Sequence, residues 1–190
     1  MKKKDQPEFL ISEPIKPEVI IAIDPDVDAS GVVFLDLLTK TMQCELMTLP
    51  ILVDNLQYMR RHCKYKFVVV VEASWLIKGN WHLDYKDTTQ RAAAKGYKVG
   101  RNHEVGLQII QFCRHLDVPY EEKYPLKKCW SGADGKITQK ELNQLLEGMG
   151  LPLMDKKEKS QEKRDAALLA LDRSGLPLIM APAKRKMKQR

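Results

Sequence analysis

Residues 19–36 have the sequence VIIAIDPDVDASGVVFLD, and this stretch decides the fold class of the chain. Its first five residues are apolar and mostly β-branched, which is typical of a buried β-strand. Asp24-Pro25 ends that strand, because this pair favours a turn. A second apolar run begins at Gly31 and continues to Leu37, so a second strand is expected directly after the turn. The folded part of the chain therefore starts with a pair of strands.

The later apolar patterns predict that helices pack against this sheet. Residues 67–71, FVVVV, form a continuous apolar run, which suits a central strand covered on both faces. Further strands are expected over 42–49 and 118–124, and helices over 51–63, 105–116, from Thr138 onward and over 161–173. A polar, glycine-containing stretch, residues 77–101, precedes the helix expected at Val105. The order β-β-β-α-β-α-β-α-α predicts an α/β protein with a mixed sheet.

Length and composition describe one globular domain. The chain has 190 residues, of which 44% are apolar and 30% are charged, enough for a full core. No apolar run approaches the roughly 18 residues of a spanning helix, so no membrane partner is expected. The four cysteines form no CxxC pair, which disfavours a zinc ribbon and favours free thiols in the cytoplasm. We divide the chain into an extended arm (1–18), a folded domain (19–178) and a basic tail (179–190).

The formal net charge of +7 is distributed unevenly along the chain. Residues 19–59 carry a net charge of −5, residues 60–140 carry +8, and residues 184–190 carry +5. A basic middle segment suggests a phosphate-rich partner such as nucleic acid, although many basic surfaces bind none.

Four carboxylates stand where a sheet fold could bring them together. Asp24 ends the first strand, and Glu72 follows the 67–71 run. Glu162 and Asp165 lie three residues apart on one face of the last helix. If the two strands are neighbours and this helix packs over their ends, the four side chains converge. Clustered carboxylates repel one another and favour Mg²⁺ or Mn²⁺. Two such ions could hydrolyse a phosphodiester.

Each of these residues also has a simpler interpretation. Asp24 before Pro25 is equally expected as a turn former. Glu72 alone is more often a solvated residue at a strand end, and Glu162 could merely complement the positive end of its helix. Asp165 is less easily explained in this way, because it directly precedes the apolar residues of the helix. The combination therefore carries the prediction.

Several segments resemble the motifs of RuvC-like Holliday-junction resolvases, in the ribonuclease-H-like superfamily. IIAIDPDVDASGVVFLD is similar to the family's first-strand motif, VVVVEASWLIKGN to its second and QEKRDAALLALDR to its last-helix motif. GYKVGRNHEVGLQII resembles the helix entry between them, and YPLKKCW resembles a segment that meets DNA. The resemblance implies an α/β, ribonuclease-H-like fold with a mixed five-stranded sheet. Three antiparallel strands would be followed by parallel ones, with helices on both faces.

The resemblance also implies a function. Asp24, Glu72, Glu162 and Asp165 would hold two Mg²⁺ ions, with Mn²⁺ as a substitute, and cut branched DNA without a small-molecule cofactor. A two-fold junction implies a homodimer. The residues expected to bind DNA are Trp75, Lys78, Asn80, Arg101, Lys127 and Lys128. Trp75 would stack at an opened base step, or would equally well pack on the sheet edge.

The sequence also departs from the family pattern. Asp26 replaces the glycine after the motif's proline, and could add a metal ligand or merely solvate a turn. Glu162 stands where the family usually has Asp, and Gly79 is an additional residue between Lys78 and Asn80. The substrate is therefore open. A nuclease for RNA–DNA hybrid or flap DNA, and a noncatalytic nucleic-acid-binding protein with the same fold, are the alternatives.

Overall fold

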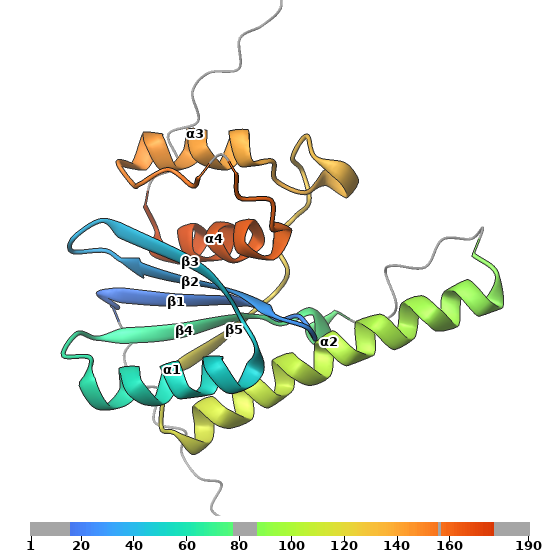
Figure 1. Cartoon of the computed structure of the whole chain (residues 1–190), viewed down its shortest axis with the longest axis horizontal. Helices are drawn as coiled ribbons and strands as arrows, with labels where there is room; N and C mark the ends of the chain where they lie inside the picture. The colour runs from blue at the N-terminus through green and yellow to red at the C-terminus, as the bar shows by residue number, and fades with distance from the viewer. Residues whose placement is uncertain (1–15, 78–86, 156, 177–190) are drawn as a thin grey trace, which may run out of the picture.

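A five-stranded sheet in the order β3-β2-β1-β4-β5 forms the centre of the computed structural model, which describes residues 16–77, 87–155 and 157–176 (Figure 1). The strands are β1 (Val19–Asp24), β2 (Ser30–Asp36), β3 (Thr41–Met47), β4 (Phe67–Glu72) and β5 (Tyr120–Lys123). β1, β2 and β3 pair antiparallel, whereas β4 pairs parallel with both β1 and β5. Three antiparallel strands are thus followed by parallel ones in a mixed five-stranded sheet, so the predicted α/β fold class is confirmed.

The register of the sheet brings the ends of β1 and β4 to one edge. Ile23 pairs with Val71 across these parallel strands, so Asp24 and Glu72 leave them side by side. Asp24 also pairs with Gly31 at the start of β2. The carboxyl ends of parallel strands are where open α/β sheets form their crevices, and here two acids stand at that point.

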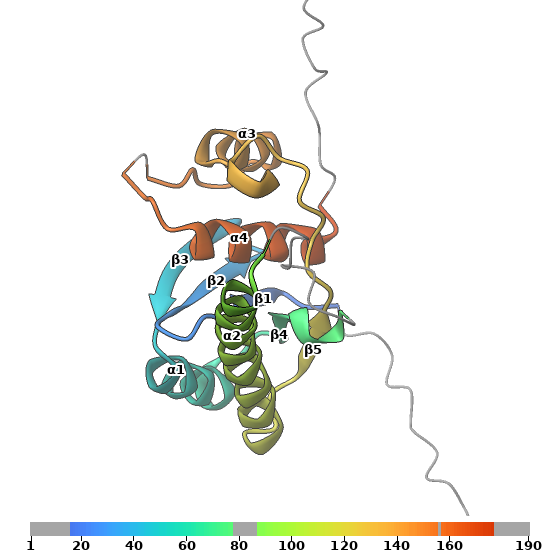
Figure 2. The same cartoon turned by 90° about the vertical axis from the view of Figure 1, so that its right-hand side faces the viewer.

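Helices cover both faces of the sheet (Figures 1 and 2). The helices are α1 (Leu49–His62), α2 (Thr89–His115), α3 (Gln139–Met149) and α4 (Gln161–Ser174). α4 lies on one face with α3 outside it, while α1 and α2 cover the other. Ile20 and Val68 belong to the core cluster under α4, whereas Ile21 and Val69 belong to the cluster under α1 and α2. Both sides of β1 and β4 are therefore apolar, which explains their continuous apolar runs.

α4 packs closely against the sheet because both contribute small residues. Its inward side includes Ala166, Ala167 and Ala170, which are fully buried. A Cβ atom added to Gly31 would lie only 2.1 Å from the carbonyl oxygen of Glu162. Glycine at position 31 therefore lets the first turn of α4 approach β2, and this contact fixes where the acidic residues of α4 stand.

Thr138 and Ser160 cap the helices that were expected from Thr138 onward and over 161–173. The Thr138 side chain accepts a hydrogen bond from the Glu141 backbone N–H, and the Glu141 side chain accepts one from the Thr138 backbone N–H. This reciprocal pair is a capping box. Ser160 accepts a hydrogen bond from the Lys163 backbone N–H, and Gly175 ends α4 in the left-handed conformation.

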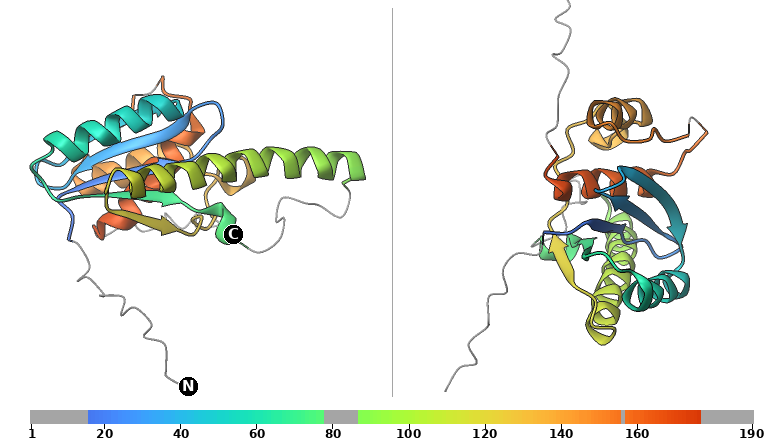
Figure 3. Two further views of the ribbon diagram at one scale, coloured as in Figure 1. Left: turned by 90° about the horizontal axis from the view of Figure 1, so that it is seen from below. Right: turned by 90° about the vertical axis from the view of Figure 1, so that its left-hand side faces the viewer.

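The expectation that the second long helix begins at Val105 is wrong, because α2 begins at Thr89. Its first half projects beyond the end of the sheet (Figures 1 and 3), while its buried residues, such as Ile109 and Cys113, lie in the second half. A helix segment without a packed face needs no apolar periodicity, so the usual sequence signal is missing. Residues 92–94 are alanines, the best helix formers, and Thr88 caps the helix start.

Three predicted features fall wholly or largely outside the described residues. They are the arm, except for residues 16–18, the tail at 179–190, and the segment that contains Lys78 and Asn80. Among the described residues, no helix is both long enough and apolar enough to cross a membrane.

Candidate active site

A pocket lies at the sheet edge where β1 and β4 end and α4 begins. Its lining includes Asp24, Glu72, Glu162 and Asp165, so the structure brings the four predicted acids to one place. α2 contributes Val99, Asn102 and His103, and the segment after β5 contributes Lys127, Lys128, Trp130 and Lys136. The cavity volume is about 200 Å³. Roughly seven waters occupy this volume in the liquid, so the pocket has room for a group of the size of a phosphate.

Asp24 stands at the end of β1, the middle strand of the sheet. Burial raises the pKa of its carboxyl group well above the usual value. The charge of Glu72 raises it further, followed by the charge of Asp165, whereas Lys136 lowers it. Ionised Asp24 is therefore costly unless positive charge stands close to it.

Glu72 is perturbed in the same direction. Burial raises its pKa from 4.5 to about 7, and the charge of Asp165 contributes. The ammonium groups of Lys128 and Lys136 act in the opposite direction. A carboxyl group with this pKa is partly protonated at neutral pH, because burial removes the water that would stabilise its charge.

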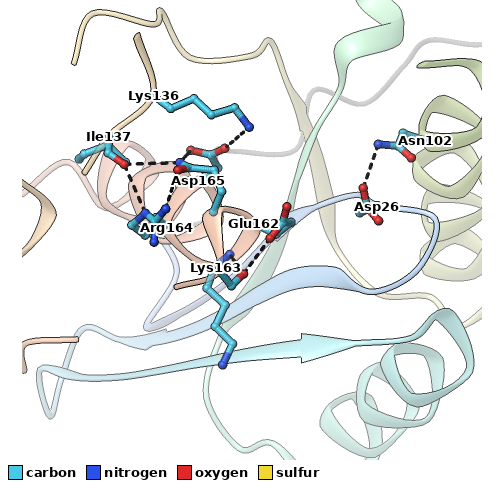
Figure 4. Close-up of polar contacts among 10 residues, drawn as sticks. Asp26, Asn102, Lys136, Ile137, Glu162, Lys163, Arg164 and Asp165 are labelled. Carbon is cyan, nitrogen blue, oxygen red and sulfur yellow. Dashed lines mark hydrogen bonds and ion pairs between the residues drawn. The ribbon is translucent and has the colours of Figure 1, made fainter. Parts of the chain in front are cut away.

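The two acids of α4 have hydrogen-bonding partners of their own (Figure 4). The Ser160 hydroxyl donates to Glu162 Oε2 at 2.9 Å. Gln161 Nε2 donates to Asp165 Oδ1 at 2.7 Å, and Lys136 Nζ lies 3.5 Å from Asp165 Oδ2. These contacts hold both acids at the wall of the pocket.

The donor set suits Mg²⁺, but the side chains as they stand do not form a ligand shell. Within 16–77, 87–155 and 157–176, no three His, Cys, Asp or Glu side chains are placed to hold one metal ion. Carboxylate oxygens are nevertheless the hard donors that Mg²⁺ prefers, and burial together with the charge of Asp165 raises the pKa of both Asp24 and Glu72. The acids would have to rearrange their side chains to hold a cation between them.

The lysines nearest the acids come from the segment after β5. Lys127 and Lys128, both predicted to bind DNA, line the pocket. Lys136 also lines it, and this residue carried no distinctive signal in the sequence. Arg101 is exposed on α2, with its guanidinium carbon 5.7 Å from the centre of the Tyr97 ring, and is not part of the pocket lining.

Trp75 lies in a short 3₁₀ helix, η1 (Ser74–Leu76), and does not line the pocket. Its Nε1–H donates to Glu122 Oε2 at 3.0 Å. The ring packs against α2, where a Cβ atom added to Gly106 would lie 2.2 Å from its Cζ3 atom, and His103 meets it edge-on. These contacts match the packing alternative. Base stacking by Trp75 stays a prediction that they do not test.

Asn102 joins α2 to the turn that follows β1 (Figure 4). Its Nδ2 donates to Asp26 Oδ2 at 3.1 Å, and its Oδ1 accepts from the Val27 backbone N–H at 3.2 Å. Asp26, the acid that replaces the family's glycine, therefore lines the pocket while hydrogen-bonded to α2. An asparagine in a polar stretch gives no sequence signal, and only the fold brings it to this turn.

The comparisons with known proteins find similarity only among solved structures. No protein-family model and no curated protein matches the sequence. The RuvC protein of Thermus thermophilus, in complex with a Holliday junction substrate, is 15% identical with a TM-score of 0.44. The match covers 83% of this chain and 96% of that one. Another structure of Thermus thermophilus RuvC is 15% identical with a TM-score of 0.42, covering 83% and 97% of the two chains.

Proposed function

We propose that the protein is a divalent-metal-dependent endonuclease that cuts branched DNA, with the Holliday junction as its main substrate. The observation that carries this proposal is the meeting of four carboxylates, from β1, β4 and α4, in one pocket with lysines in its lining. The resemblance of the motifs to RuvC-like resolvases supplies the substrate class.

The main contribution of the protein to this reaction would be to hold the metal ligands and the phosphate backbone in place. Asp24, Glu72, Glu162 and Asp165 would hold two Mg²⁺ ions, with Mn²⁺ as a substitute. When bound, the ions would activate a water and stabilise the leaving oxygen of the phosphodiester. The acids stand on buried strands and on a helix held close to the sheet, and rigid elements of this kind place ligands accurately. Lys127 and Lys128 would hold the phosphate backbone at the pocket.

The proposed substrate also determines the proposed assembly. A Holliday junction has two symmetry-related strands to cut, so we propose a homodimer. Residues 19–178 would form the nuclease domain, with 1–18 and 179–190 as flanking segments.

Cleavage of a synthetic four-way junction tests the proposal. We expect Asp24→Asn and Glu72→Gln to reduce Mg²⁺-dependent cleavage to background while junction binding without metal changes only a few-fold. Asp54→Asn, on the exposed side of α1, is the matched control and should cut at the wild-type rate. If the wild-type protein binds junctions but never cuts them with Mg²⁺ or Mn²⁺, the proposed nuclease activity is refuted. Equal affinity for linear duplex would refute junction selectivity, and hybrid and flap substrates in the same assay test those alternatives.

A noncatalytic nucleic-acid-binding protein is the second candidate, and one observation favours it. Lys136 already places a positive charge beside Asp165, so the acids have some compensation without a metal ion. The two candidates differ in their response to Mg²⁺. The nuclease should be stabilised against thermal unfolding by millimolar Mg²⁺ through its acids, whereas the noncatalytic protein should not respond.

A further inference from the structure

The two tryptophans that the structure describes differ in what surrounds their rings. Trp75 packs against α2 and uses its Nε1–H for a hydrogen bond to Glu122. Trp130 instead lines the acidic pocket. Within the described part of the chain, its Nε1–H donates no hydrogen bond, and it is not among the buried atoms without a partner. This nitrogen therefore remains accessible to water or to a ligand.

The segment that carries Trp130 is held by backbone turns. The Trp130 backbone N–H donates to the Gly135 carbonyl, and the Gly132 backbone N–H donates to the Lys136 carbonyl, both at 3.0 Å. Gly135 has a φ of +73°, in the left-handed region. A Cβ atom at Gly132 would lie 2.4 Å from the Lys136 carbonyl oxygen, so this close turn also requires glycine.

A side-chain contact fastens the same segment to α3. Glu141, which closes the capping box of α3, accepts a hydrogen bond from the Ser131 backbone N–H at 3.0 Å. The Trp130 ring also packs against the core cluster that contains Ile137. A ring supported in this way loses little conformational entropy when a ligand binds to it.

The surroundings of Trp130 favour a nucleotide over an apolar ligand. Lys127 and Lys128 precede it on the same segment and line the same pocket. An aromatic ring beside lysines is the combination with which proteins bind unpaired nucleotides: the ring stacks on a base while the lysines neutralise phosphates. An acidic pocket alone would repel the phosphates, so these lysines are needed on the substrate side.

We propose that Trp130 is a nucleobase subsite, on which an unpaired base next to the cleaved phosphate stacks. Trp75 then packs β5 against α2 and does not touch DNA. The subsite rests on the proposed function, because it assigns the position of a base in a substrate whose backbone lies at the acidic pocket.

Tryptophan fluorescence tests this subsite, because stacking on a base quenches the indole. The proteins would carry Trp81→Phe, since the chain has three tryptophans and Trp81 lies outside the described residues. Three such proteins would be titrated with a four-way junction in EDTA: one with no further change, one with Trp75→Phe and one with Trp130→Phe. We expect junction binding to quench the fluorescence of the first two proteins. In the third protein, the quenching should be at most half as large.

Affinity gives a second, independent measurement. Trp130→Ala should weaken junction binding about 5- to 150-fold, the range for loss of one stacked base, and Trp130→Phe should restore most of it. The dependence of affinity on salt should not change, because no phosphate contact is lost. A thermal melt of each variant identifies loss of fold, and Trp130→Phe keeps the test valid if Trp130→Ala does not fold.

The outcomes separate the subsite from the proposed function. If the junction binds and is cut but Trp130→Phe is quenched as fully as its parent, the subsite is refuted and the nuclease stands. Loss of quenching in Trp75→Phe instead would assign the stacking to Trp75. If the wild-type protein neither binds nor cuts branched DNA, the proposed function itself fails, and the subsite with it.

Discussion

α4 and α2 contribute to the same pocket from opposite faces of the sheet, but they are attached to the sheet differently. α4 presses buried alanines and its first turn against the sheet, whereas the first half of α2 projects beyond it (Figure 3). α4 carries two of the proposed metal ligands, and the projecting half of α2 carries Arg91, Lys95, Lys98 and Arg101. Metal ligands must be placed to within about 0.5 Å, but phosphate contacts tolerate movement. The rigidity of each attachment therefore fits the chemistry proposed for it.

The largest expected effect comes from adding one methyl group under α4. In Gly31→Ala, the new Cβ would overlap the Glu162 carbonyl oxygen, so α4 must shift or tilt. We expect a loss of about 1–3 kcal/mol of unfolding free energy, measured by urea denaturation. Junction cleavage should fall roughly 100-fold or more, since displacement of reacting groups by about 1 Å has that effect.

Gly100→Ala in the projecting half of α2 is the matched control for this change. Its added Cβ meets nothing within 4 Å, and alanine is the better helix former. It should therefore stabilise the protein by up to about 1 kcal/mol and leave cleavage unchanged. Equal effects of the two substitutions would contradict the difference in attachment between the helices.

The next effect concerns the free energy of unfolding, which decreases when a buried acid at the end of a strand ionises. Because the folded protein raises the pKa of Glu72 from 4.5 to about 7, it binds a proton that the unfolded chain has lost. The contribution of Glu72 to the free energy of unfolding is thus fully present below pH 4.5, and it is lost as the pH rises through about 7. Glu72→Gln cannot ionise, so at pH 8 in EDTA it should be more stable than wild type, by at most about 3 kcal/mol.

Thermal melts at several pH values measure this difference. The advantage of Glu72→Gln should disappear near pH 4.5, and Mg²⁺ should stabilise the wild type more than the variant. Glu147→Gln, on the exposed side of α3, controls for the removal of a carboxylate and should show no such dependence. A variant less stable than wild type at pH 8 would show that Glu72 is stabilised by its surroundings, against the proposed metal site.

A smaller effect is expected where α2 is tied to the turn after β1. Asn102→Ala removes two hydrogen bonds, one to Asp26 and one from Val27, and should cost about 1–2 kcal/mol in urea denaturation. Amide exchange at Val27 should become faster, because its N–H loses its acceptor. Asn55→Ala, which removes one exposed hydrogen bond within α1, is the control and should change stability by less than Asn102→Ala. Unchanged exchange at Val27 would mean that Asn102 does not hold this turn.

The difference between features set by neighbouring residues and features set by distant ones shows what the sequence can and cannot predict. The ends of β1 and β4, the caps at Thr138 and Ser160 and the extent of α4 follow from local patterns, because each depends on neighbouring residues. The first half of α2 has no packed face and so no periodicity, and it was missed. Which tryptophan faces the pocket depends on how distant segments meet, and Lys136 and Asn102 reach the pocket in the same way.

The smallest effect on stability is expected from the exposed basic side chains of α2. Substitution of these side chains also tests most directly whether α2 binds DNA. Lys98→Gln and Arg101→Gln lie on the projecting half of the helix, where loss of a charge should leave the melting temperature within about 1 °C of wild type. If this half follows a DNA backbone, each substitution that removes one phosphate contact lowers the slope of log affinity against log salt by about 0.9. The double variant should therefore lose up to about two units of slope in junction binding, whereas Trp130→Ala loses none. Slopes equal to wild type would mean that the projecting half of α2 carries charge without binding DNA, and that Lys127 and Lys128 at the pocket hold the backbone alone.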